Sequence, residues 1–205
     1  MSFLRWTPSF LGFPLGGWLA FQLVGSANSP QTAAVTGAIA GTLIGAAQWL
    51  ALRPAVSWHW IAASTMGMGA GSALAAAITA SATSVGALSL SGLIAGAAVG
   101  LGQGFAFRRT WQAIALWTFT VGASWALGWV VTANVIVDAD RGYVAFGSSG
   151  ALVVTLITGL VLRRLLGSRT DMSAPPASPA VRHSSDGHST HRHSADAGTA
   201  AGAQP

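Results

Sequence analysis

Three residue types are missing from this sequence of 205 residues: cysteine, lysine and glutamate. Without cysteine, the chain has no disulfide framework, no thiolate nucleophile and no cysteine-ligated metal site. Charge is scarce as well, because all ten basic residues are arginine, all five acidic residues are aspartate, and charged residues make up only 7% of the chain. A soluble domain is about one quarter charged, so this composition excludes water as the solvent of most of the chain.

Long apolar stretches take the place of charge. The chain is 52% hydrophobic, and six stretches approach the roughly 20 residues that a helix needs to cross a bilayer. No arginine or aspartate lies in the middle of any of them. Backbone groups in hydrocarbon must bond to each other within their own segment, which a helix achieves. The sequence therefore predicts an all-α membrane protein with six transmembrane helices, at about residues 8–25, 33–52, 58–80, 90–107, 111–136 and 147–166.

Arginine sorts the connections between these stretches into two sides. The basic side carries Arg5, Arg53, Arg108, Arg109, Arg163, Arg164 and Arg169. The opposite connections contain only Arg141, beside Asp138 and Asp140. By the positive-inside rule, both termini are predicted to be cytoplasmic, in the cytoplasmic (inner) membrane of a bacterium. We also expect an aromatic belt at the basic side, formed by Trp6, Trp49, Trp58, Trp60 and Trp111.

The sequence repeats at an offset of 55 residues. Three glycines and three arginines coincide at this offset, namely Gly37, Gly92 and Gly147, and Arg53, Arg108 and Arg163. A fixed period of this kind indicates repeated structural units. We predict a transmembrane domain over residues 1–169, built from three tandem two-helix hairpins at about 1–55, 56–110 and 111–167. Because each unit makes two crossings, all three copies enter the membrane in the same orientation.

Glycines four residues apart form a face on two of the predicted helices, because such positions lie above one another. The glycines are Gly37, Gly41 and Gly45 in the first copy and Gly92, Gly96 and Gly100 in the second. Helices pack closely in lipid through such small residues, which predicts that these faces hold the bundle together.

Gln48 and Gln103 lie three residues beyond the last glycine of each face, and Thr158 takes that position in the third copy. A polar group on a packing face forms hydrogen bonds between helices. Two interpretations stay open for these three residues: hydrogen bonds between helices, or a central polar site that the three copies share.

The arginines at the ends of the even-numbered stretches have a topological interpretation. A cation there suits the negative end of the helix macrodipole and the anionic headgroups. We assign this role to Arg53, Arg108, Arg109, Arg163 and Arg164. A basic ring for an anionic solute or lipid is the alternative.

Residues 170–205 change composition to alanine, proline, serine, glycine, threonine and histidine. Such a segment cannot bury a core, which predicts a disordered cytoplasmic tail. His191 and His193 are weak candidates for metal ligands, because no cysteine or glutamate accompanies them. The sequence predicts no cofactor.

The residues that end the glycine faces carry a resemblance. Gln48-Trp49 is followed by Leu52-Arg53, and Gln103-Gly104 is followed by Phe107-Arg108-Arg109. Over about residues 33–130 the chain resembles a set of glycine-rich multi-pass bacterial membrane proteins that have no assigned activity. The resemblance implies a membrane location and no particular reaction.

These observations favour a structural or accessory bundle that packs with lipid, with another membrane protein or with a second copy of itself. The alternative is a passive channel or carrier for a small neutral or anionic solute. An enzyme is not expected, because the predicted helices contain no acid, base or metal ligand in their interiors. Nucleic-acid binding is not expected either, because no basic stripe is interleaved with aromatic residues.

Overall fold

The computed structural model describes residues 3–107, 110–135 and 147–172. Within these ranges every regular element is helical, which confirms the all-α prediction for the described part of the chain. The elements are α1 (Phe3–Trp6), the 3-10 helix η1 (Thr7–Leu11), α2 (Gly12–Val24), α3 (Pro30–Leu52), α4 (His59–Thr79), α5 (Val85–Ala106), α6 (Trp111–Val135) and α7 (Ser148–Met172).

Five of these helices are long and apolar enough to cross a membrane. The spans are Pro30–Leu52, His59–Thr79, Val85–Ala106, Trp111–Asn134 and Ser148–Leu166. They correspond to the second to sixth stretches predicted from the sequence, and their apolar character supports a membrane protein.

The first predicted stretch, residues 8–25, differs from the prediction. It forms η1 and α2 instead of one α-helix, and α2 has only 13 residues. Pro8 and Pro14 explain the break, since a proline has no backbone N–H and its ring clashes with the carbonyl four residues earlier. The turn before Pro14 therefore adopts the tighter 3-10 geometry.

Serine caps position the starts of two long helices. The Ser29 side chain accepts a hydrogen bond from the Thr32 N–H, the Thr32 hydroxyl accepts one from the Ser29 N–H, and Pro30 opens α3. Ser84 caps α5 by accepting a hydrogen bond from the Ala87 N–H. Because caps satisfy the free N–H groups of a first turn, they fix where these helices begin.

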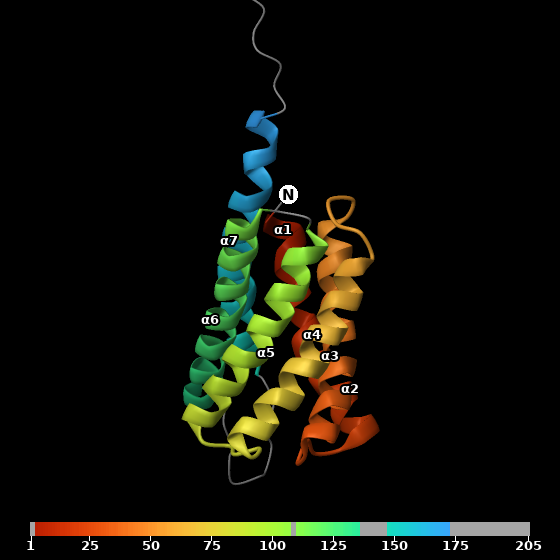
Figure 1. Ribbon diagram of the computed structural model, residues 1–205, viewed down its shortest axis with the longest axis vertical. Helices are drawn as coiled ribbons and strands as arrows, with labels where there is room; N and C mark the ends of the chain where they lie inside the picture. The colour runs from red at the N-terminus through yellow and green to blue at the C-terminus, as the bar shows by residue number, and fades with distance from the viewer. Residues whose placement is uncertain (1–2, 108–109, 136–146, 173–205) are drawn as a thin grey trace, which may run out of the picture. The chain divides into compact units, whose positions relative to one another are not determined.

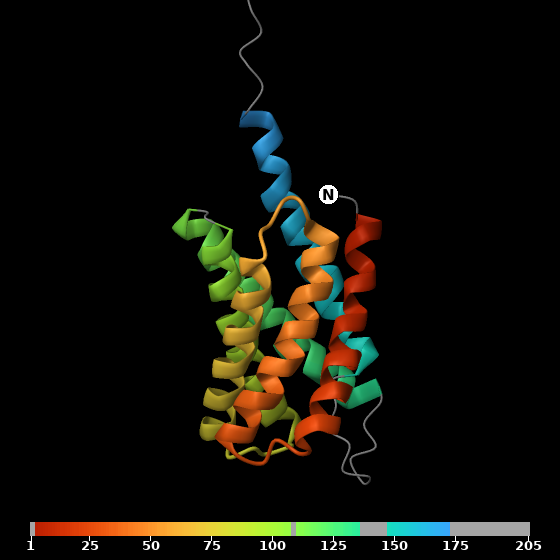
Figure 2. The same ribbon diagram turned by 90° about the vertical axis from the view of Figure 1, so that its right-hand side faces the viewer.

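The helices form a ring in which each long helix packs against its neighbour in the chain, and α7 packs back against α1, η1 and α2. Figures 1 and 2 show this closure, with the first and last elements side by side. Figure 1 also shows that α1 and the last turns of α7 lie at the same end of the bundle. The α2–α3 and α4–α5 connections lie at the opposite end.

Candidate functional site

The glycine face of α3 packs against α4. A Cβ atom added at Gly41 would lie 2.5 Å from the Ser64 carbonyl oxygen, and one added at Gly37 would lie 2.6 Å from the Met68 carbonyl oxygen. A Cβ at Gly45 would lie 2.7 Å from the Ser64 Cβ. No real Cβ atom tolerates such distances to backbone, so only glycine permits this approach of the two helices.

The glycine face of α5 packs in the same way against α6. Added Cβ atoms at Gly92 and Gly96 would each lie 2.9 Å from a backbone carbonyl oxygen, of Trp125 and Val121 respectively. A Cβ at Gly100 would lie 2.9 Å from the Thr118 Cα. Each of these glycine faces therefore joins a helix to the next one along the chain.

Gln48 and Gln103 meet at the ends of these two faces. The Gln103 amide nitrogen donates to the Gln48 Oε1 over 3.1 Å and to the Ser64 Oγ over 2.9 Å. Gln48 is 8% exposed and Gln103 only 1%. Two of the three polar residues singled out from the sequence are thus joined directly, across α3 and α5.

Two tryptophans complete this group and fix the orientation of both amides. The Trp60 indole N–H donates to the Gln48 Oε1, and the Trp117 indole N–H donates to the Gln103 Oε1, each over 3.1 Å. An indole nitrogen can only donate, so both amide oxygens must face the indoles. We call Gln48, Trp60, Ser64, Gln103 and Trp117 the amide cluster. In this arrangement the Gln48 amide oxygen accepts two hydrogen bonds, and the Gln48 amide nitrogen has no acceptor among the described residues.

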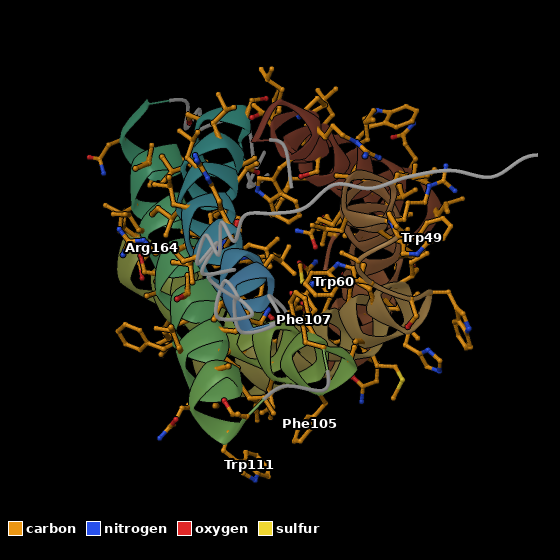
Figure 3. The ribbon with its side chains drawn as sticks, turned by 90° about the horizontal axis from the view of Figure 1, so that it is seen from above. Trp49, Trp60, Phe105, Phe107, Trp111 and Arg164 are labelled. Atoms are coloured by element: carbon orange, nitrogen blue, oxygen red, sulfur yellow. The ribbon has the colours of Figure 1, made fainter. Side chains whose placement is uncertain are left out.

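Aromatic rings close the amide cluster toward the end of the bundle where α1 lies. The Trp60 ring lies 5.0 Å from that of Phe107 and 6.1 Å from that of Trp117, measured between ring centroids. Seen from above in Figure 3, Trp60 and Phe107 point into the bundle, while Phe105 and Trp111 point outward. The Phe107 ring also lies 6.2 Å from that of Trp117, so the three rings pack against one another beside the amides.

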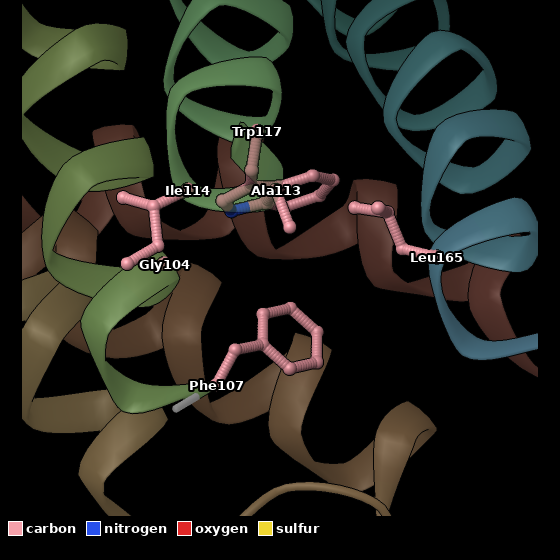
Figure 4. A pocket seen from close by; sticks show the side chains of 6 residues that line it. All are labelled: Gly104, Phe107, Ala113, Ile114, Trp117 and Leu165. Carbon is pink, nitrogen blue, oxygen red and sulfur yellow. The ribbon is translucent and has the colours of Figure 1, made fainter. Parts of the chain in front are cut away.

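A small void remains beside these rings, between α5, α6 and α7, and Figure 4 shows its lining. Its volume is about 10 Å³, at the lower limit for one water molecule. The lining is apolar except for the Trp117 indole, which already donates to Gln103. The void offers no polar partner and is expected to be dry. Its lining residues are Gly104, Phe107, Ala113, Ile114, Trp117 and Leu165.

Thr158 does not join the amide cluster. Its hydroxyl lies 2.6 Å from the Val154 carbonyl oxygen and donates to it, within α7 itself. Near this level the indole N–H of Trp6 donates to the Thr155 carbonyl oxygen over 2.7 Å. Trp6, Trp60 and Trp117 therefore each donate to the second helix of a predicted hairpin. Only Gln48 and Gln103 accept through side-chain amides, whereas Thr155 accepts through its backbone carbonyl.

The aromatic belt predicted from the sequence is wrong for two of its members. Trp6 and Trp60 are completely buried, whereas Trp58 is 62% and Trp111 72% exposed. Trp58 and Trp60 are two residues apart, so helical periodicity directs them to nearly opposite sides. These tryptophans do lie near helix ends, but a position near a helix end does not determine which way the side chain points.

Sequence reasoning missed Ser64 and Trp117. Trp117 had a detectable signal, because Trp6, Trp60 and Trp117 are spaced by nearly the repeat length. Pairing these tryptophans with Gln48 and Gln103 would have identified the donors. Ser64 had no such signal, since its hydroxyl also bonds to the Trp60 carbonyl within α4, as serines in helices commonly do.

The described arginines lie at the surface of the bundle. Arg53 is exposed, and its guanidinium carbon lies 5.0 Å from the centre of the Trp49 ring. Arg163 and Arg164 are exposed near the end of α7. Arg108 and Arg109 lie outside the described residues, and so do His191, His193 and the loop with Asp138 and Asp140. Among the residues that are described, no three potential metal ligands gather.

An apolar groove of about 420 Å³ runs along the outer surface of α5 and α6. Its rim is formed by strongly exposed side chains, with Trp111 and Phe119 each 72% exposed. Small residues, Ala97, Ala115 and Gly122, line the groove between them. This surface can accept an apolar chain or a helix.

No protein-family model, no curated protein and no solved structure matches this chain.

Proposed function

We propose that this protein is a membrane-embedded helix bundle that serves as a rigid accessory partner for another membrane protein, and that it does not conduct a solute along its axis. The observation that carries the proposal is the direct bond between Gln48 and Gln103. The polar groups at the centre of the bundle bond to one another and lie beneath closed aromatic rings. Groups used in this way stabilise packing and leave no open polar path at that level.

We further propose that residues 3–24 supply a sixth crossing, which completes three hairpin repeats. α1, η1 and α2 follow one another without a gap and together reach roughly 35 Å, enough for the hydrocarbon core of a bilayer. The recurring tryptophan donors and the two glycine faces support the repeat.

The proposed orientation places both termini in the cytoplasm of a bacterium, because the arginines gather at that side. The chain has no cysteine, so single reporters can be introduced cleanly. Ser26→Cys should react with an impermeant thiol reagent added outside intact cells, and Ser168→Cys should react only after lysis. The reverse pattern would overturn the orientation.

The groove on α5 and α6 is the proposed docking surface, because its small floor and aromatic rim suit a partner helix. Ala115 is exposed within the groove, so Ala115→Phe should fill it without disturbing the interior. We expect a membrane protein that co-purifies with the wild-type chain in mild detergent to be lost from this variant. Ala77→Phe, at an exposed position of α4 outside the groove, is the matched control. Equal retention by both variants would exclude the groove.

One observation favours the alternative, a passive pathway for a small neutral or anionic solute: the Gln48 amide nitrogen has two N–H groups without an acceptor among the described residues. Reconstitution of the purified chain in liposomes separates the two functions. The accessory role predicts no uptake of urea or chloride, together with lower thermal stability of Gln48→Leu and Gln103→Leu. Uptake that falls in both variants would establish the pathway instead.

A further inference from the structure

Buried hydroxyl groups without a hydrogen-bond partner concentrate along α7. Six such groups occur among the described residues, and five lie on α7 or on elements that pack against it. One of the five, Thr118 on α6, lines the outer groove of α5 and α6. We call the other four the α7 seam: Ser149 and Thr155 on α7, Thr132 on α6, and Ser9 on η1. Unpartnered hydroxyls are therefore a feature of the interface between α7 and its neighbouring helices.

The position of each hydroxyl supports this grouping. Cβ atoms added at Gly147 and Gly150 would both contact Thr132, so Thr132 faces the start of α7. Ser9 follows Trp6 by three residues, one turn of a 3-10 helix, and Trp6 reaches the Thr155 carbonyl. Thr155 lies six residues along α7 from Ser149, roughly 9 Å deeper in the bundle.

Ser149 is half-buried and the other three residues are deeply buried, and none of the four hydroxyls uses the usual substitute partner. Thr132 is 1%, Thr155 2% and Ser9 3% exposed. A serine or threonine in a helix commonly donates to the carbonyl four residues earlier. Thr120 and Thr158 do so here, but Thr132 and Thr155 do not. A buried hydroxyl left unpaired is unfavourable, so each needs a partner that none of the described residues provides.

The four hydroxyls of the seam determine which kind of molecule can bind there. Each hydroxyl can both donate and accept, and no charged side chain lies among the four. An ion would lose its hydration shell without gaining a counter-charge, which excludes ions. We infer that the α7 seam binds small neutral molecules that both donate and accept hydrogen bonds, of which water is the simplest. The bundle then has a hydrated interface beside α7, away from its closed axis.

Water-edited solid-state NMR of the full chain with labelled threonine, reconstituted in phosphatidylcholine liposomes, tests this inference directly. The methyl signals of Thr132 and Thr155 should gain polarisation from water severalfold faster than those of Thr120 and Thr158. Those two controls are also buried, but their hydroxyls are bonded within their own helices. Thr132→Val and Thr155→Val assign the signals. Transfer to Thr132 and Thr155 as slow as transfer to the controls would overturn the inference.

Thermal stability gives a second test with opposite signs for a hydrated and a dry seam. Thr155→Val keeps the shape and removes the hydroxyl, so it should lower the melting temperature where that hydroxyl holds water. In a dry seam the same change removes an unpaired polar group and raises the melting temperature, which would contradict the inference. Thr155→Ser, which keeps the hydroxyl, separates loss of the hydroxyl from loss of packing. The inference does not depend on the proposed accessory function, and neither test measures transport or partner binding.

Discussion

In the block formed by α3, α4, α5 and α6, the amides of Gln48 and Gln103 bond to each other and to indoles of neighbouring helices. Along α7, by contrast, the buried hydroxyls of Ser149 and Thr155 have no partner among the described residues. Both regions are packed within the same bundle and use neutral polar residues. They differ in whether polar side chains bond across helices, although the block also holds the unpartnered hydroxyls of Ser89 and Thr118.

The difference in bonding across helices follows from side-chain length at one position of the predicted repeat. Gln48 and Gln103 carry amides that extend to the next helix, whereas Thr158, at the equivalent position of α7, reaches only the carbonyls of its own helix. At the positions that the 55-residue offset aligns, two amides thus bond across helices where a threonine bonds only within its own helix. Four predictions break or sharpen this comparison, and the free energy of unfolding in detergent measures each.

The largest effect is expected where backbones touch in the block. Gly41→Ala places a Cβ atom against the Ser64 carbonyl, and forced overpacking of this kind destabilises by about 3 kcal/mol. Gly17→Ala on α2 is the control, because nothing lies within 4 Å of its Cβ position. The control should be neutral or stabilising, since alanine favours helix over glycine. Similar losses in both variants would mean that the glycine face does not determine packing.

Loss of an amide comes next. Gln103→Leu leaves the Trp117 N–H without its acceptor, and a buried unpaired donor of this kind should lower stability by roughly 2 kcal/mol. Because Gln48 and Gln103 share a hydrogen bond, the double variant with Leu at both positions should lose clearly less than the sum of the single losses. Gln22→Leu, at an exposed position of α2, should change little. Strict additivity would show that the two amides act separately.

The sequence predicted much of the block and little of the seam. The six apolar stretches and the positions of the glycines followed from patterns that the chain itself displays, and five stretches form helices of spanning length. The break at η1 was not predicted, because the apolar run over residues 8–25 indicates one helix, whereas Pro8 and Pro14 divide it. No pattern could show that Ser9 and Thr155 lack partners, because partnership depends on how α7 meets the first helices.

The inward direction of tryptophans was also beyond the apolar pattern. Trp60 and Trp117 lie on helices that are apolar on all sides, so hydrophobic periodicity cannot tell the side that faces lipid from the side that faces the bundle. The amides indicate that inner side, because glutamine avoids hydrocarbon. The residues that bond to them were therefore predictable only in part.

The indole N–H of tryptophan occurs in both regions, so its removal allows a direct comparison between them. Trp117→Phe leaves the Gln103 Oε1 without the donor that it has from α6, and we expect a loss of about 1.5 kcal/mol. Trp6→Phe removes a donor from the Thr155 carbonyl, which also accepts from the Thr158 hydroxyl over 3.3 Å. Its loss should be smaller, roughly 0.5 kcal/mol. If Trp6→Phe proves the more damaging, then the indole bond is a main support of the α7 interface.

The smallest expected effects distinguish a bonded serine from an unbonded one. Ser64 and Ser9 are both buried, at 1% and 3% exposure, but Ser64 accepts from the Gln103 amide and Ser9 has no partner among the described residues. Ser64→Ala should therefore lower stability by about 1 kcal/mol, because one N–H of Gln103 loses its acceptor. Ser9→Ala should lower it by less than about 0.5 kcal/mol, since water released from the seam regains most of its hydrogen bonding in bulk. The gain in helix propensity from serine to alanine is common to both changes and cancels. Equal losses of stability in the two variants would show that Ser9 has a partner within the protein. The contrast between block and seam would then not include η1.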